Sequence, residues 1–125
     1  MSFGVSDAVS SILKTAIDGL TARQNVTADN IANVDTPGFT ATTVAFETAL
    51  KEAIQSGAYN GSLASLPQIP ITTEATQTPV GANGNNVDLR HEEVAMIQTQ
   101  YTYSIMGRAI SDHYDLMKTA MGMNP

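Results

Sequence analysis

Apolar residues recur at helical spacing near both ends of the chain, and this pattern constrains the fold more than any other feature. In the N-terminal part, one helical face carries Val9, Leu13, Ala16, Leu20, Thr27, Ile31 and Val34. We predict a helix over residues 6–34, which Ser6 or Asp7 can cap at its start. Because a helix of this length cannot cover such a stripe by itself, it needs a partner helix.

The last segment, residues 89–122, predicts a second long helix with two apolar faces. Asp88 can cap it, and Glu92 and Glu93 suit the positive end of the helix dipole. One face carries Val94, Ile97, Tyr101 and Ile105, and the other carries Tyr103, Met106, Ile110, Tyr114, Met117 and Met121. One partner of these two faces is the N-terminal helix, and the other is most simply a neighbouring subunit. We therefore predict a mainly α fold, with the terminal helices packed as an antiparallel, coiled-coil-like pair.

The residues that connect these helices predict a turn, a short helix and a long polar loop, within one domain over residues 1–125. Pro37 and Gly38 indicate that residues 35–43 form a turn and an extended segment. The short helix is expected over residues 44–55. Its apolar face would carry Phe46, Ala49, Leu50, Ala53 and Ile54, opposite a Glu47–Lys51 pair.

Residues 56–88 contain three prolines, at positions 67, 70 and 79, and very little charge. A connection of this kind is far longer than the usual loop of about 2–6 residues. Ile69, Ile71 and Val80 could pair as short β-segments, although the prolines keep any strand short. We predict a polar loop with little or no β-structure.

Composition excludes several functions. The chain has no cysteine, which excludes disulfides and Cys-based zinc sites. Its formal net charge is −6 and it has no basic patch, which argues against binding to nucleic acid. The first 20 residues contain Asp7, Lys14 and Asp18 and lack the apolar core of a secretory signal, so we expect any export to proceed without a cleaved signal peptide.

No group of residues predicts catalysis, metal binding or a cofactor. His91-Glu92 resembles the start of a zinc-protease helix, but Ala95 stands where the second histidine is required. We interpret His91 and His113 as solvent-facing helix residues. The glycine-containing run at residues 81–86 lacks the lysine and the spacing of a phosphate loop, and predicts a turn that enters a helix. We therefore predict that the protein is not an enzyme.

A distinctive run, Ala-Asp-Asn-Ile-Ala-Asn-Val-Asp-Thr-Pro-Gly-Phe, occupies residues 28–39 at the end of the first predicted helix. Its asparagines are poor helix formers that bond readily to the backbone at a helix end, and its Pro-Gly pair turns the chain. The run resembles the signature of the bacterial flagellar basal-body rod protein family. Residues 84–89 are similar to the proximal rod type within that family, whereas Asp29 departs from the small or Asn residue that is common there. The motif positions are Asn30, Ile31, Ala32, Asn33, Thr36, Pro37, Gly38, Phe39, Asn86 and Asp88.

The resemblance implies a structural subunit of the proximal rod, which polymerises helically into a drive shaft that transmits motor torque and encloses the export channel. As partners it implies other copies of the chain, other flagellar rod proteins, the membrane-ring and rod-adaptor proteins of the basal body, and the flagellar type III export apparatus. It implies a location in the flagellar basal body, on the periplasmic side of the inner membrane.

We expect apolar residues of both long helices to make the assembly contacts, namely Leu13, Leu20, Ile31, Val34, Ile97, Tyr101, Ile105, Met106, Ile110 and Met117. An aspartate at Leu20 or Ile97 should then block incorporation, because it places an unpaired charge in an apolar interface. Another short rod subunit, or a helical export adaptor or chaperone of the flagellar system, is the alternative; the adaptor accounts for the helices but not for the motif. An enzyme would require an activity that depends on His91 or His113.

Overall fold

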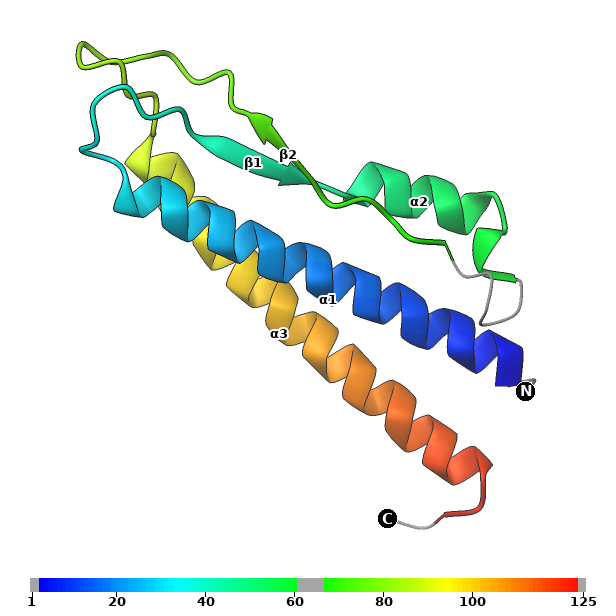
Figure 1. Ribbon diagram of the computed structural model, residues 1–125. Coiled ribbons are helices and arrows are strands. Elements are labelled where there is room, and N and C mark those ends of the chain that lie inside the picture. Colours follow the sequence, from blue (N-terminus) through cyan, green and yellow to red (C-terminus); the bar gives the residue numbers. More distant parts are fainter. Residues whose placement is uncertain (1–2, 61–66, 124–125) are drawn as a thin grey trace.

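The computed structural model describes residues 3–60 and 67–123 and is mainly helical, as predicted (Figure 1). In chain order its elements are α1 (Phe3–Ala32), β1 (Thr42–Ala45), α2 (Glu47–Gln55), the 3-10 turn η1 (Ala58–Asn60), β2 (Thr72–Ala75) and α3 (Leu89–Ala120). Figure 1 shows α1 and α3 packed side by side in opposite directions, which confirms the antiparallel pair. No helix in the described part of the chain is long and apolar enough to cross a membrane.

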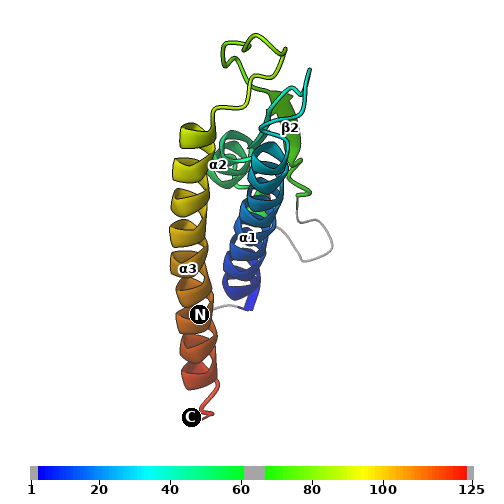
Figure 2. The same cartoon turned by 90° about the vertical axis from the view of Figure 1, so that its left-hand side faces the viewer.

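The helix ends lie close to the predicted ones and have clear physical causes. The side chain of Asp88 accepts a hydrogen bond from the backbone N–H of His91 at 3.2 Å and so caps α3, as predicted. The α1 helix ends at Ala32, before Pro37, and Gly38 adopts a φ of 74° in the turn that follows. Figure 2 shows that α3 extends beyond the start of α1, so its C-terminal end is not covered by that helix.

The boundaries of the middle segment differ from the prediction. Residues 44 and 45 belong to β1 and not to a helix, and α2 begins only at Glu47. The predicted extended segment at 35–43 ends in the first residues of the same strand. The predicted polar loop at 56–88 contains η1 and β2, while residues 61–66 of that loop lie outside the described part.

The β1 and β2 strands form a two-stranded antiparallel sheet in which Val44 is paired with Thr73. The β-branched residues at positions 42–44 favour this extended conformation. Pro70 and Pro79 flank β2 and limit its length, in agreement with the prediction of little β-structure. In both Figure 1 and Figure 2 the sheet lies on the side of α1 that faces away from α3.

A small apolar core joins the sheet, α2 and α1. It consists of Leu20, Val44, Phe46, Leu50 and Tyr59, all buried. Phe46 is not part of a helix, since its backbone lies at φ −153°, and its ring packs directly against Gly19 of α1. A side chain at position 19 would overlap this ring, so the glycine permits the close approach of the sheet segment to α1.

Candidate functional site

The first motif residue, Asn30, connects the end of α1 to the start of β1. Its side-chain Nδ2 donates to the carbonyl of Thr42 at 2.7 Å, and its Oδ1 accepts from the N–H of Thr42 at 3.1 Å. The side chain thus pairs with this backbone as a neighbouring strand would. Asn30 is only 1% exposed, and both of its polar atoms are satisfied.

The turn that follows α1 is organised by Asn33 and Thr36. Asn33 Nδ2 donates to the carbonyl of Asp29 at 2.8 Å, and Thr36 Oγ1 donates to Asn33 Oδ1 at 3.1 Å. The N–H of Gly38 then donates to the carbonyl of Asn83 at 3.0 Å, which joins this turn to the one before α3. Gly84 has a φ of 79°, and its turn confirms the interpretation of residues 81–86.

Asn85 and Asn86 complete the connection between the two motif segments. Asn85 Nδ2 donates to the carbonyls of Asn33 and Thr36, at 2.7 and 2.8 Å, and so satisfies acceptors at the end of α1. Asn86 Oδ1 accepts from the N–H of Ala41 at 2.6 Å. We call Asn30, Asn33, Asn85 and Asn86 the asparagine cluster. It brings both motifs together at one end of the helix pair.

Asn85 lies within the second motif run at residues 84–89 but not among its individually named positions, although it is buried and makes the longest-range contacts of the cluster. The signal available in the sequence was its place in the Gly-Asn-Asn run just before the capped helix. That run predicts a turn, but it does not reveal that the amide reaches a helix end about fifty residues earlier in the chain.

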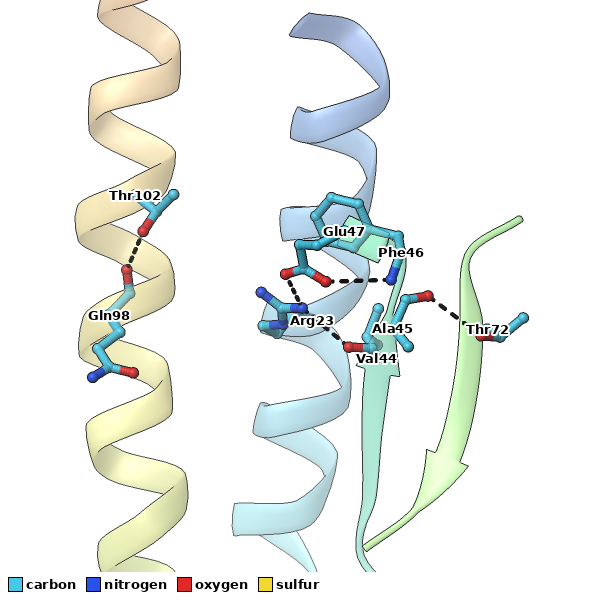
Figure 3. A network of polar contacts seen from close by, with 8 residues as sticks. All are labelled: Arg23, Val44, Ala45, Phe46, Glu47, Thr72, Gln98 and Thr102. Atoms are coloured by element: carbon cyan, nitrogen blue, oxygen red, sulfur yellow. Dashed lines mark hydrogen bonds and ion pairs between the residues drawn. The ribbon is translucent and has the colours of Figure 1, made fainter. Parts of the chain in front are cut away.

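A second polar network, centred on Arg23 of α1, fixes β1 and α2 (Figure 3). Arg23 Nη2 donates to the carbonyl of Val44 at 3.0 Å, its guanidinium lies 5.2 Å from the centre of the Phe46 ring, and it forms an ion pair with Glu47. The predicted Glu47–Lys51 pair is therefore wrong. Tertiary packing brings Arg23 to the carboxylate and gives Glu47 a partner outside its own helix.

This environment changes the acidity of Glu47. Burial raises the pKa of the carboxyl group, but hydrogen bonds from its own N–H, from Arg23 and from the N–H of Phe46 outweigh this effect and lower the pKa below its usual 4.5. The charged form is therefore the one that the folded chain stabilises.

The predicted assembly residues fall into three groups. Leu20 is 4% exposed and lies in the core of the chain itself, so it has almost no surface to offer another copy. Six others are half-buried in the single chain: Leu13, Ile31, Val34, Met106, Ile110 and Met117. The remaining three, Ile97, Tyr101 and Ile105, are exposed on α3, as is their neighbour Val94. We call these four exposed residues the α3 stripe.

The histidines are placed differently from one another. His91 is exposed at the start of α3, as predicted. His113 is half-buried and its Nε2 lies 3.1 Å from Ser10 Oγ of α1, so it is a contact between the long helices and not a solvent-facing residue. Among residues 3–60 and 67–123, no three His, Asp or Glu side chains are grouped closely enough to hold a metal ion.

These features, an asparagine cluster at the head of a helix pair and an uncovered apolar stripe, occur in a chain that is similar to flagellar proteins. Residues 13–40 match the family described as flagella basal body rod protein. The flagellar basal body rod protein FlgB of Borrelia hermsii is 34% identical over 113 residues, which cover 78% of this chain and 84% of that protein. The FlgB proteins of Borreliella burgdorferi and Bacillus subtilis are 30% and 27% identical and are covered over 83% and 89% of their lengths.

The matched segment at 13–40 contains Asn30, Asn33 and the turn that these residues organise. With this identity over most of both chains, the protein belongs to the FlgB family of flagellar basal body rod proteins.

Proposed function

We propose that the chain is a structural subunit of the proximal rod of the bacterial flagellar basal body. Copies would polymerise helically into the drive shaft that transmits motor torque and encloses the export channel. The observation that carries this proposal is the exposed α3 stripe in a member of the FlgB family. A shaft subunit has to present apolar surface to its neighbours, and it needs no catalytic group.

The α3 stripe has the properties of an interaction surface. Ile97 and Tyr101 are 67% and 72% exposed, and Val94 and Ile105 extend the same face by one turn on either side. Burying a large apolar side chain of this kind contributes about 1.5–3 kcal/mol. Contiguous apolar surface on one face is typical of protein–protein contacts, whereas isolated exposed apolar residues are not.

The proposal extends to partners and location. We infer assembly with other rod proteins and with the membrane-ring and rod-adaptor proteins, on the periplasmic side of the inner membrane. Delivery would be by the flagellar type III export apparatus. Family membership supports a flagellar location in general, and the proposed neighbours are those that a proximal rod subunit would contact.

The proposal is tested by replacing the gene in the source bacterium with an epitope-tagged copy and isolating the basal bodies. We expect the tagged chain to co-purify with the rod in several copies per basal body, and deletion of the gene to abolish motility. Immunogold electron microscopy should place the tag at the membrane-proximal part of the rod. An adaptor or chaperone would instead be absent from the purified rod and would bind one partner at a fixed ratio, and that result would refute the proposal.

A further inference from the structure

A groove of about 950 Å³ runs along the chain beside α3. Its floor is α1, one side is formed by β1 and α2, and the other side is formed by α3. The apolar lining that keeps exposed surface includes Ala16, Val26, Ile54 and Met106, above the buried core residues Leu20 and Leu50. Figure 3 shows Arg23 of α1 and Glu47 of α2 beside β1, and Gln98 and Thr102 on α3; all four residues line the groove.

The α3 side of the groove carries small or polar side chains at Ala95, Thr99 and Thr102. Small residues along one side allow the backbone of a second helix to come close. A groove with an apolar floor and polar sides is typical of a site that binds an amphipathic helix.

Glu92 gives the groove an unusual electrostatic feature. The residue is 5% exposed, lies in the first turn of α3 and lines the groove. Within the described part of the chain its carboxylate has no hydrogen bond and no ion pair. The helix N-terminus favours an anion at this position. The carboxylate oxygens of Glu92 are not among the fully buried atoms that lack a partner, so they reach the solvent that fills the groove. An occupant that brings a cation to this end of the groove would give the carboxylate a direct partner.

The α3 stripe of another copy meets these requirements. Its residues are spaced i, i+3, i+7 and i+11, which is the pattern of anchors on a helix that binds in a groove. Arg90 precedes Val94 by four residues, so it lies on the same face of α3. It is exposed and forms no ion pair with any described residue.

We propose that the groove of one copy binds the α3 stripe of a second copy, with Arg90 of the second copy paired to Glu92. The inference rests on the proposed function, because a rod needs contacts that propagate. Groove and stripe occupy different faces of α3, so one copy can offer its stripe and receive a neighbour at the same time. Two different surfaces that meet in this way form a ring or an open helical assembly and not a two-fold dimer. Because Arg90 and Glu92 both lie at the start of α3, their pairing requires the two α3 helices to run in the same direction with their starts close together.

The absence of cysteine in the sequence makes disulfide cross-linking a clean test. Two tagged copies are co-expressed in the source bacterium, one with Lys51→Cys on the α2 side of the groove and one with Tyr101→Cys on the stripe. Basal bodies are isolated and oxidised, and cross-linked dimers are identified by non-reducing electrophoresis and mass spectrometry. The matched controls are Glu52→Cys and Gln100→Cys, which are exposed neighbours outside both surfaces.

We expect a cross-link between positions 51 and 101 that is severalfold more abundant than any pair involving a control cysteine. If the variants are present in the basal bodies but this cross-link does not exceed the controls, the groove is not the receptor and the inference is wrong. If the wild-type chain is absent from the basal bodies, the proposed function fails, and the inference fails with it.

Exchanging the two charges tests the proposed Arg90–Glu92 pair separately. Glu92→Arg and Arg90→Glu should each reduce the 51–101 cross-link severalfold. A chain that carries both changes should recover most of it, because the pair is then reversed and not lost. Equal cross-linking in the chain without a charge change, the two single variants and the double variant would show that Arg90 and Glu92 do not take part in the contact.

Discussion

Replacing Gly19 with alanine places a methyl group against the Phe46 ring, and the structure fixes the size of the effect. The new Cβ would lie 2.5 Å from Cε1 and 2.6 Å from Cδ1 and Cζ of that ring, whereas carbon atoms in favourable contact are about 3.5–4.0 Å apart. The ring cannot move freely, since it is buried in the core and lies against the Arg23 guanidinium.

Opposing contributions decide the sign of the change. Removing a glycine from a helix interior stabilises by about 1 kcal/mol, whereas overpacking a core costs about 1–3 kcal/mol. Displacing the ring from Arg23 costs about 0.5–1 kcal/mol more at a partly exposed site. We therefore expect Gly19→Ala to lower the free energy of unfolding by about 0.5–3 kcal/mol.

The measurement is urea unfolding followed by circular dichroism, with Gly107→Ala as the matched control. Gly107 also lies inside a long helix, but a Cβ there meets nothing within 4 Å, so this variant should gain about 1 kcal/mol. In a Phe46→Ala background the penalty at position 19 should disappear. If Gly19→Ala stabilises the protein as much as Gly107→Ala does, the ring does not lie against Gly19 and the account of the core is wrong.

Asn30→Ala should lower the free energy of unfolding by about 1–3 kcal/mol, since it leaves backbone groups of β1 without partners; Asn25→Ala, on the exposed side of α1, should change it by less than about 0.5 kcal/mol in the same urea titration. Leu20→Asp should unfold the chain, as seen by circular dichroism, because it buries a charge in the core. Ile97→Asp should leave the free energy of unfolding unchanged within about 0.5 kcal/mol and should reduce incorporation into basal bodies. Normal incorporation of a folded Ile97→Asp chain would contradict the proposed role of the α3 stripe. The pKa of Glu47 is lowered in the folded chain, so the stabilisation from its charged form is present above the usual value of 4.5 and is lost as the pH falls through the lowered pKa. The difference in unfolding free energy between wild type and Glu47→Gln, about 0.2–1 kcal/mol for such an exposed pair, should therefore shrink on acidification. A difference that grows would refute the assignment of the ion pair.

The long helices could be predicted from the sequence because their apolar periodicity and their caps are local features. Asp88 and Pro37 act on neighbouring residues, so the start of α3 and the end of α1 follow from them. The identity of the partner could not be predicted in the same way. Leu20 and Ile97 both lie on apolar stripes, yet one is buried in its own chain and the other is exposed. Periodicity shows that a face needs a cover, but it does not show which segment supplies that cover.

The middle segment was predicted less well because its structure depends on distant residues. Val44 and Phe46 match a helical face, but the Asn30 side chain pairs with the adjacent backbone of Thr42 and favours a strand. Glu47 has a local partner available at Lys51, yet it pairs with Arg23. The motif residues were identified by resemblance alone, and only the structure shows that the asparagine cluster joins the two segments.

The central claim, that the α3 stripe is covered by another subunit in the rod, is tested most directly by thiol labelling at position 97. The Ile97→Cys variant would carry one cysteine in a chain that has none, and a maleimide reagent can be applied to the free protein and to isolated basal bodies. Because Ile97 is 67% exposed in the single chain, we predict rapid labelling of the free protein and strong protection in the basal body. Equal labelling in both states would show that the stripe remains open in the rod and would contradict the account.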